Sequence, residues 1–312
     1  MNGFRLLASG RALPGTRVTN EDMSRMVETS DEWIRTRTGI RQRYFCKEGE
    51  SAVSLAVAAA KQALFRSGLE AEEIGCCVCA SISSDYATPS MACIVQAALG
   101  LSEEIPALDV NAACSGFLYG MTVAAGLLEV SKKKYALVIG SEQLSRLMDM
   151  SDRSTCVLFG DGAGAAIFAR CEDVPLSAYL GSRGDTVIRA AGPGMPAGYL
   201  TMDGSAVFRF AVESIPRCID ETLRRADKTL DEIDWVVCHQ ANERIIDHCV
   251  KKLSAPPEKF YRNIAQVGNT SAASIPLALA QMQEEGLLRQ GQTVLCVGFG
   301  GGLTWASLLF SI

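Results

Sequence analysis

Three side chains suited to chemistry stand where an apolar segment ends or a helix begins. Cys114 follows the apolar run IPALDV and opens the helical pattern CSGFLYGMTVAAGLLEV. His239, one of two histidines in the chain, ends the apolar segment DWVVCH, and Asn269 lies in the small-residue turn GNTSAAS before another helix. A thiol, an imidazole and an amide make a nucleophile and two hydrogen-bond donors. Acyl transfer requires such a set of groups.

The surroundings of Cys114 favour a reactive thiol. The unpaired N–H groups and the dipole of a helix N-terminus favour the thiolate, and the small residues Ala112, Ala113 and Gly116 leave room for a substrate. Taken singly, the three side chains have ordinary interpretations: a structural cysteine, a histidine at the edge of the core and a helix cap. Their similar placement favours function. The other histidine, His248, lies among charged residues within a helical pattern and is expected at the surface.

The elements that must position these residues occur twice. Residues 52–81 and 211–240 each combine a helical pattern, a short acidic turn and an apolar strand, at a constant offset of 159 positions. The strand YALVIG, which starts at Tyr135, recurs as TVLCVG at Thr293, at an offset of 158. FGDGAGAAIF and FGGGLTWASLLF form a looser pair. The chain therefore looks like two copies of one α/β unit.

This repetition predicts the fold class and the place of the site. Apolar strands that alternate with amphipathic helices indicate mostly parallel sheets covered by helices. We expect an α/β protein with two halves, residues 1–172 and 173–312. Functional sites of such sheets gather at the ends of strands, so the cleft between the halves should hold the site. The Gly- and Pro-rich stretch 181–204 is expected to be a long loop.

Composition excludes several classes of protein. The chain has 312 residues, of which 48% are hydrophobic and 21% charged, which is typical of a globular protein with two domains. A net charge of −5 argues against nucleic-acid binding. No apolar stretch reaches the length of a membrane span or resembles a signal peptide, so we expect a cytoplasmic protein. Cys76, Cys77 and Cys79 lie in the apolar run IGCCVCASI, which predicts a buried strand and no metal site.

Six motifs resemble those of the beta-ketoacyl-acyl-carrier-protein synthase III family, in the thiolase superfamily. They are SDEWIRTRTGIRQR, DVNAACSGF, FGDGAGAA, HQAN, GNTSAAS and FGGGLTW, in the family's order and spacing over nearly the whole chain. The resemblance implies a thiolase-like fold in which the two halves form five layers, αβαβα, and a homodimer. It implies an acyltransferase that initiates fatty acid synthesis. An acyl primer passes from acyl-CoA to the enzyme and condenses with malonyl-acyl-carrier-protein, which yields 3-ketoacyl-acyl-carrier-protein, CoA and CO2.

The resemblance also assigns roles to the three reactive residues. It makes Cys114 the nucleophile, with the backbone N–H groups of Cys114 and Gly301 as its oxyanion hole. His239 and Asn269 hold the malonyl thioester carbonyl during decarboxylation. Loss of CO2 leaves a carbanion that survives only as an enolate, and two preorganised donors stabilise that charge. No cofactor is implied, because the coenzyme A thioesters are substrates.

Three further groups of residues match functional positions of the family. Those that match coenzyme A contacts are Thr29, Trp33, Arg37, Arg153, Gly204, Phe208 and Asn242. Those that match walls of the primer pocket are Thr88, which the partner subunit contributes, Leu144, Phe159, Met202 and Phe299. Those that match the basic patch for the acidic acyl carrier protein are Arg209, Arg244, Lys251 and Lys252. Many members carry Phe at the position of Thr88, so a deeper primer pocket is expected unless Tyr86 or a bulky wall fills the space.

Other functions stay open on the sequence alone. A relative from specialised metabolism would use the same chemistry to make alkylquinolones or polyketide starters. A cysteine hydrolase can also present Cys, His and Asn in this order, but the papain signature is absent and the duplicated sheet pattern does not fit. An ATP-binding protein could use FGDGAG as a phosphate loop. That motif lacks the GK[ST] ending of a P-loop and is interpreted as a tight turn.

Overall fold

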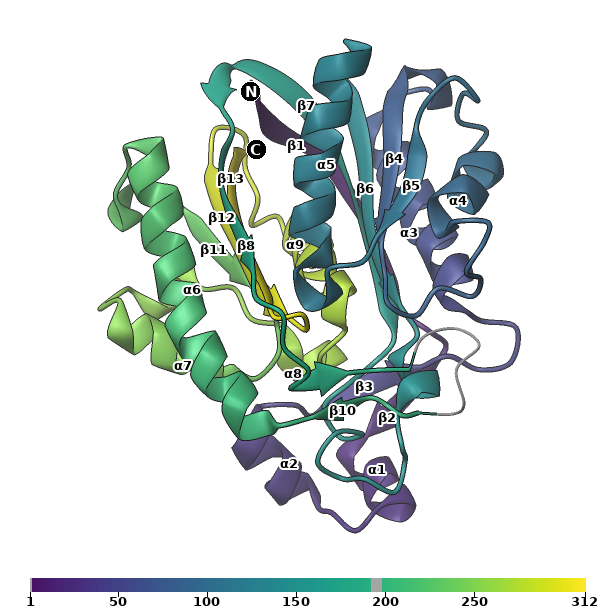
Figure 1. Cartoon of the computed structure of the whole chain (residues 1–312), viewed down its shortest axis with the longest axis vertical. Coiled ribbons are helices and arrows are strands. Elements are labelled where there is room, and N and C mark those ends of the chain that lie inside the picture. Colours follow the sequence, from purple (N-terminus) through teal and green to yellow (C-terminus); the bar gives the residue numbers. More distant parts are fainter. Residues whose placement is uncertain (1, 192–197) are drawn as a thin grey trace.

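Helices and sheets alternate in five layers in the computed structural model, which describes residues 2–191 and 198–312 (Figure 1). The first sheet contains, in order, β5 (Ala107–Val110), β4 (Ile74–Ala80), β6 (Tyr135–Glu142), β7 (Gly162–Pro175) and β1 (Asn2–Ala12). The second contains β11 (Trp235–Cys238), β12 (Thr293–Gly300), β13 (Thr304–Ser311) and β8 (Ser177–Ser182). β1 and β13 run parallel where the two sheets meet, with Arg5 opposite Ser311, so the nine strands are joined in one continuous hydrogen-bonded sheet.

The strand pairings repeat between the sheets. β1 pairs antiparallel with β7, β7 antiparallel with β6, and β6 parallel with β4. In the same way, β8 pairs antiparallel with β13, β13 antiparallel with β12, and β12 parallel with β11. The offset of 158 positions seen in the sequence therefore relates strands that occupy equivalent positions in the two sheets. The division at residue 172 falls near the end of β7 and stays a prediction.

Alternating side chains of each strand face different helical layers, as the pleat of a strand requires. In β4, Cys77 and Cys79 pack against the layer of α3 (Ala52–Ser67) and α4 (Met91–Leu99), whereas Cys76 packs toward the middle layer. The same alternation in β12 directs Leu295 toward the outer helices α6 (Gly204–Ala226) and α7 (Glu243–Lys252). Both faces of each sheet are covered, which explains the continuous apolar strands. The predicted fold class is confirmed, and the three cysteines are free and buried as expected.

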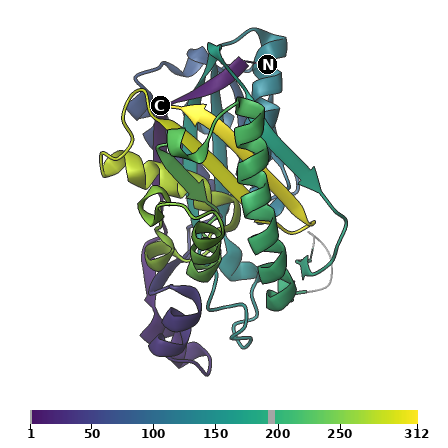
Figure 2. The same ribbon diagram turned by 90° about the vertical axis from the view of Figure 1, so that its left-hand side faces the viewer.

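The middle layer consists of α5 (Gly116–Ser131) and α9 (Ser274–Glu284). Residues 113–131 are long and apolar enough, by length and composition, to cross a membrane, and half of their most apolar stretch is buried in the protein. Figure 1 places α5 between the two sheets. Apolar residues on most sides are expected of a helix packed on both faces. In Figure 2, α6 lies across the strands of the second sheet on the outer side.

Two short helical turns introduce the middle helices: η2 (Ala113–Ser115) before α5 and η6 (Ser271–Ala273) before α9. The first residue of each turn has a positive φ, 47° at Ala113 and 49° at Ser271. These two residues are 158 positions apart, so the second turn repeats the first. A non-glycine residue in this region of φ is uncommon and costs conformational energy. The duplicated strain is consistent with two turns held firmly between the sheets.

A smaller substructure covers the lower end of the molecule in Figure 1. Its elements are β2 (Thr16–Thr19), α1 (Asn20–Met26), α2 (Asp31–Thr38), β3 (Gln42–Phe45) and the short helix α8 (Ile264–Val267). Helix α2 starts where the Ser30 side chain accepts a hydrogen bond from Trp33 N, and it ends at Gly39 in the left-handed conformation. These caps fix the direction of the helix that carries Trp33 and Arg37.

Two expectations about local structure were wrong. The stretch 181–204 is not one loop, because Gly181 still belongs to β8 and the stretch contains the strand pair β9 (Ile188–Arg189) and β10 (Thr201–Met202). It connects β8 to α6, and its residues 192–197 lie outside the described part. The helix expected from residue 211 begins at Gly204, where the Asp203 side chain caps it. The sequence pattern did not indicate Asp203 as the cap, because a strand of only two residues precedes it.

Candidate active site

Cys114, His239 and Asn269 line one cavity, although they come from three distant segments. Cys114 lies in η2 after β5, His239 directly follows β11, and Asn269 precedes η6. The cavity has a volume of about 130 Å³ and is partly open to solvent. The ends of equivalent strands and turns from the two sheets meet here, as the repetition in the sequence predicted.

The backbone around Cys114 is tightly enclosed. A side chain on Gly300 would place its Cβ 2.6 Å from Cys114 N, so only glycine fits at the end of β12. Gly301 lines the same cavity, beside Cys114. The Gly300–Gly301 segment therefore lies against the Cys114 backbone in the wall of the cavity.

Burial opposes the ionisation of Cys114 that its position before a helix favours. Burial raises the pKa of the Cys114 thiol to about 12, the Ser271 hydroxyl partly opposes that rise, and the charge of Glu142 adds to it. The residue as a whole keeps some exposed surface, but the thiol itself is enclosed. Removal of water from around a thiolate disfavours it, and this opposes the stabilisation by the helix N-terminus.

His239 is a neutral hydrogen-bond donor in this environment. Its side chain is buried, its ring meets the Phe299 ring edge-on at 5.3 Å, and its backbone N donates to Val297 O at 2.8 Å. Burial lowers the pKa of His239 to about 3, so the ring is uncharged at neutral pH. Nδ1 is buried without a hydrogen-bond partner. An unpartnered buried N–H is costly, which favours the tautomer with the hydrogen on Nε2.

Hydrogen bonds of both its backbone and its side chain orient Asn269. Its backbone N donates to Leu158 O and its O accepts from Gly160 N, both at 2.9 Å. Its side-chain Oδ1 accepts from Ser271 N at 2.9 Å. Because the amide oxygen is occupied, the Nδ2 hydrogens are the groups left to face a ligand. Asn269 thus offers a second neutral donor in the same cavity as His239.

The cavity walls are mostly apolar. Four predicted primer-pocket residues lie in them: Leu144, Phe159, Met202 and Phe299. Apolar wall residues that the sequence reasoning missed are Ile82, Leu158, Ile188, Leu200, Val207 and Ile245. They come from six segments and no motif marks them. Thr88 is exposed and does not line the cavity of its own chain, so its predicted role depends on a second subunit.

The cavity opens beside the start of α6 and α7. Gly204, Phe208 and Asn242 line the cavity and also an outer groove, which Arg209 and Arg244 border. Asn242 caps α7 and donates from Nδ2 to Arg37 O at 3.0 Å. This bond ties the end of α2 to the mouth of the cavity.

Trp33 lies between two cations. The guanidinium carbon of Arg37 is 4.7 Å from the centre of the Trp33 ring, and that of Arg153 is 5.1 Å from it. Thr29, which precedes the N-cap residue of α2, has a buried hydroxyl without a partner. An indole face with two arginines suits an aromatic base that carries phosphates. The structure thus gathers these four predicted coenzyme A contacts on one side of the molecule.

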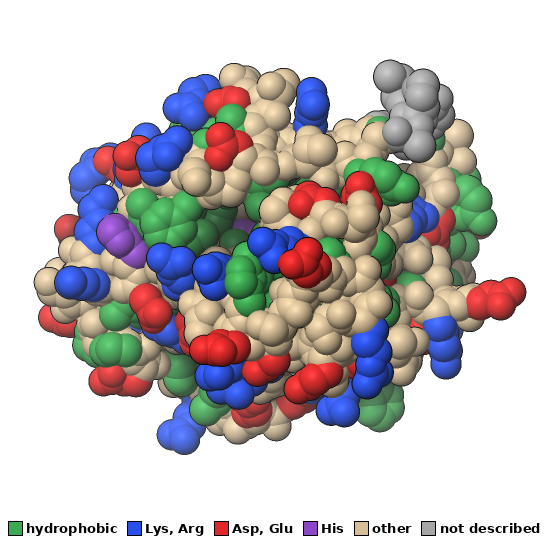
Figure 3. Space-filling model, turned by 90° about the horizontal axis from the view of Figure 1, so that it is seen from below, with side chains coloured by type: hydrophobic (Ala, Val, Ile, Leu, Met, Phe, Trp, Pro, Cys, Tyr) green, Lys and Arg blue, Asp and Glu red, His purple; other side chains and the backbone are tan. Residues whose placement is uncertain are grey.

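The predicted basic patch is exposed on neighbouring helices. Arg209 lies on α6, and Arg244, Lys251 and Lys252 lie on α7. In the part of the chain that the structure describes, none of the four forms an ion pair. Lys and Arg side chains gather around a hollow lined with hydrophobic side chains in the view from below (Figure 3). His248, expected at the surface, is exposed on α7.

Two family models match the chain. Residues 108–184 match "3-Oxoacyl-[acyl-carrier-protein (ACP)] synthase III", and residues 223–312 match the C-terminal model of the same family. The first match contains Cys114, and the second contains His239 and Asn269.

Full-length relatives have the same name. The chain is 42% identical to a beta-ketoacyl-[acyl-carrier-protein] synthase III from Natranaerobius thermophilus, over 99% of each chain, and 44% identical to one from Rhodospirillum rubrum, over 96% of each chain. Among solved structures, 3-oxoacyl-[acyl-carrier-protein] synthase III from Aquifex aeolicus superposes with a TM-score of 0.92, at 41% identity, over 98% of this chain and 99% of that one. The priming beta-ketosynthase of the R1128 polyketide pathway also reaches 0.92, at 33% identity, over 99% and 97%.

Proposed function

Since the chain belongs to the beta-ketoacyl-[acyl-carrier-protein] synthase III family, the condensing enzymes that initiate fatty acid synthesis, we propose that Cys114, His239 and Asn269 perform its two half-reactions. The observation that carries this proposal is their position on one cavity. The direct test is the mass of the covalent adduct on Cys114 after exposure to a mixture of acyl-CoAs. An unmodified Cys114 would contradict it.

In the first half-reaction, the Cys114 sulfur attacks the thioester carbonyl of acyl-CoA. The carbonyl oxygen gains negative charge as the new C–S bond forms. The backbone amides of Cys114 and Gly301 donate to that oxygen, and the bond to the coenzyme A sulfur then breaks. The apolar walls accept the alkyl part of the primer and exclude water from the thioester.

In the second half-reaction, His239 and Asn269 hold the thioester oxygen of malonyl-acyl-carrier-protein. Loss of CO2 moves the electron pair into an enolate, whose oxygen carries the charge. Two neutral donors stabilise it, and no base is needed because no proton is removed. The enolate carbon attacks the acyl carbon on Cys114, and the thiolate leaves. The low pKa of His239, caused by burial, suits a donor and not a base.

Substrates reach the cavity through the groove at Gly204, Phe208 and Asn242. We assign the pantetheine arm to this groove, because it joins the cavity to the outside. Trp33, Arg37 and Arg153 bind the nucleotide end of coenzyme A: the base stacks on the indole and the arginines pair with phosphate. The base takes the place of one guanidinium over the ring. No further cofactor takes part in this scheme.

The basic patch docks the acyl carrier protein. Arg209 and Arg244 stand at the groove through which the pantetheine arm would enter, and Lys251 and Lys252 continue the patch along α7. An acidic partner explains why a chain of net charge −5 keeps such a patch.

Reversing a charge in this patch should impair only the half-reaction that uses the carrier. Arg244→Glu or Lys252→Glu is expected to raise KM for malonyl-acyl-carrier-protein about 10-fold at low salt and less at high salt, because exposed charges mostly steer association. Acylation by acyl-CoA should change little. Lys61→Glu, an exposed lysine on α3, is the matched control and should leave both KM values unchanged. Equal damage to both half-reactions would indicate a structural role for the patch.

A homodimer would complete the primer pocket. Strand β5 ends the first sheet and pairs only with β4 among the described strands, so its outer edge is open. The half-buried apolar residues Val110, Val123 and Leu127 lie in this region of the core. Such an edge favours pairing with a second copy. Tyr86 is 57% exposed, and Thr88 beside it would then reach the partner's cavity. We place the dimer in the cytoplasm.

The enzyme should accept primers longer than acetyl. Thr lacks most of the aromatic ring that closes the pocket in many members, and each buried methylene contributes about 0.8 kcal/mol. The preference should be graded, because apolar pockets separate single methylenes by only about 1–3 kcal/mol. The measurement is kcat/KM for acetyl-, butyryl-, branched C5- and octanoyl-CoA. Thr88→Phe should shift the profile toward acetyl; strong acetyl preference in both proteins would show that Tyr86 or another wall fills the space.

The same profile separates fatty acid initiation from specialised metabolism. The structural likeness to a polyketide priming synthase keeps the second pathway as the alternative. Because the chain belongs to this family, we no longer consider the cysteine-hydrolase and ATP-binding interpretations. In FGDGAG, Asp161 is buried and accepts hydrogen bonds from Cys46 N and Ser145 N, both at 2.8 Å, so the motif ties neighbouring segments together.

A further inference from the structure

The irregular segment 81–85 follows β4 and carries one wall of the cavity. Its residue Ile82 packs against the apolar cluster that contains Leu144, Phe159 and Leu200. All four side chains line the cavity, so together they shape the space that would receive the alkyl part of the primer. Polar side chains hold the segment in place, and the two half-reactions give these polar side chains no role.

Ile82 separates the cavity from a second hollow beside it. Ile82, Ile188 and Leu200 line both spaces. The second hollow also has small apolar residues in its walls, Ala190 and Ala191. Side chains that line two neighbouring spaces form the partition between them. A shift of Ile82 away from the cavity would therefore open the cavity toward the hollow and make room for a longer alkyl chain.

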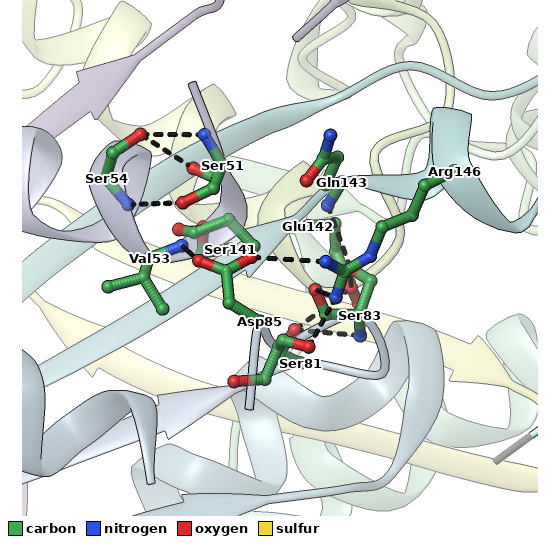
Figure 4. A network of polar contacts seen from close by, with 12 residues as sticks. Ser51, Val53, Ser54, Ser81, Ser83, Asp85, Ser141, Glu142, Gln143 and Arg146 are labelled. Atoms are coloured by element: carbon green, nitrogen blue, oxygen red, sulfur yellow. Dashed lines mark hydrogen bonds and ion pairs between the residues drawn. The ribbon is translucent and has the colours of Figure 1, made fainter. Parts of the chain in front are cut away.

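Glu142, at the end of β6, is fully buried and holds the segment through one carboxylate oxygen. Its Oε2 accepts hydrogen bonds from the Ser83 hydroxyl, from the Ser81 hydroxyl at 3.2 Å and from Ile82 N at 3.1 Å (Figure 4). The Ser83 hydroxyl oxygen accepts in turn from Gln143 N at 2.8 Å. A buried carboxylate is costly unless such donors satisfy it, so the carboxylate and the segment fix each other's position.

Arg146 holds the other end of the segment from the protein surface. Its guanidinium donates to Ser83 O at 2.5 Å and forms an ion pair with Asp85 Oδ1 at 3.2 Å (Figure 4). Asp85 Oδ2 accepts from Val53 N at 3.2 Å, at the start of α3. Because these side chains bond to the backbone, they fix the path of the segment. Glu142 and Arg146 together form a clamp on it.

The clamp stands on a fixed base, the helical turn η3 (Leu144–Leu147) after β6. Asp161 Oδ1 accepts a hydrogen bond from Ser145 N at 2.8 Å. Leu147 O accepts from Leu200 N at 2.7 Å. Two walls of the cavity, the first residue of η3 and Leu200, are thus fixed to each other. The clamp attaches the partition to the same base.

We propose that the clamp limits the length of the primer by holding Ile82 in place as the partition of the pocket. This proposal rests on the proposed function, because the pocket concerned is the one in which the acyl group on Cys114 would lie. The clamp residues act through Ile82, so they are positioning residues for primer specificity. Loosening either arm lets Ile82 yield to a long alkyl chain, whereas a short primer ends before the partition and keeps its rate.

The test compares the second-order rates at which butyryl-CoA and octanoyl-CoA form the Cys114 adduct, followed by mass in the full-length enzyme. Arg146→Met removes the exposed arm of the clamp. It should raise the octanoyl-to-butyryl ratio of rates about 10-fold, because apolar walls discriminate between primers on that scale. Glu142→Leu removes the buried arm and should shift the ratio in the same direction. Glu142→Gln keeps an oxygen that can accept from Ile82 N, so its ratio should stay within about threefold of the wild-type value.

A double substitution shows whether the clamp acts through Ile82. Ile82→Ala should raise the octanoyl-to-butyryl ratio by itself, because it opens the partition directly. In that background Arg146→Met should change the ratio little, since the effects of residues that act through one another do not add. A general loss of stability would instead lower both rates together and leave the ratio unchanged.

Arg66→Met is the matched control. Arg66 also donates to a backbone carbonyl, Ser9 O at 3.0 Å, and pairs with Glu284 at 2.8 Å, but it does not line the cavity. Its variant should keep the wild-type ratio. An unchanged or lower ratio in Arg146→Met, or in a Glu142→Leu that still forms the adduct, would overturn the proposal. Failure of the wild type to acylate Cys114 would instead contradict the proposed function.

Discussion

Cys114→Ser should abolish acyl transfer and covalent labelling together. A serine hydroxyl has a far higher pKa than a thiol and is a weaker nucleophile toward thioesters, so the rate of acylation should fall on the order of 10³-fold or more. The enclosed site makes this loss larger, since burial disfavours either anion. The measurement is the mass of the intact protein and of its peptides after exposure to acyl-CoA.

Cys93→Ser is the matched control for this substitution. Of the twelve cysteines, only Cys93 is exposed. It lies on α4 and does not line the cavity. The variant should acquire the acyl group at the wild-type rate. Normal labelling of Cys114→Ser would show that another cysteine is the nucleophile, and Cys93 would be the first candidate.

His239→Ala and Asn269→Ala should impair decarboxylation far more than acylation. Loss of one preorganised donor to an oxyanion typically costs about 3–4 kcal/mol, or roughly 10²- to 10³-fold in rate. Cys114 has its own amide donors in the first half-reaction and should still acquire the acyl group. The two quantities to compare are CO2 released from malonyl-acyl-carrier-protein and acyl adduct formed from acyl-CoA.

The pH dependence of decarboxylation follows from the same geometry. Burial holds the pKa of His239 at about 3, so its neutral form dominates at every pH above that value. CO2 release by pre-acylated enzyme should therefore show no limb from His239 between pH 5 and pH 8. His248→Ala, which changes the exposed histidine, should release CO2 as the wild type does. The roles would be reversed if both cavity variants acylated poorly and decarboxylated well.

The repeated pattern of the sequence was sufficient to predict the α/β fold with two similar halves. Strands such as β4 and β12 are apolar throughout because both faces are covered, and that continuity is visible in the letters IGCCVCA and TVLCVGFG. The small residues of the turns before α5 and α9 make these turns recognisable in the sequence. The placement of Cys114, His239 and Asn269 on one cavity follows from these ends of elements. The irregular segment before α6 was predicted poorly, since short strand pairs there have no period to detect.

What the sequence by itself determined is the set of reactive groups, the duplicated architecture and the family. What only the tertiary structure decided is the ionisation of those groups. The pKa of Cys114 depends on its burial and on the Ser271 hydroxyl, which belongs to a segment more than a hundred positions away. Helix position alone predicted an easily ionised thiol, because local sequence records the dipole of a helix but not the loss of water around the sulfur. Burial is a property of the assembled layers, and it opposes the ionisation that the helix end favours.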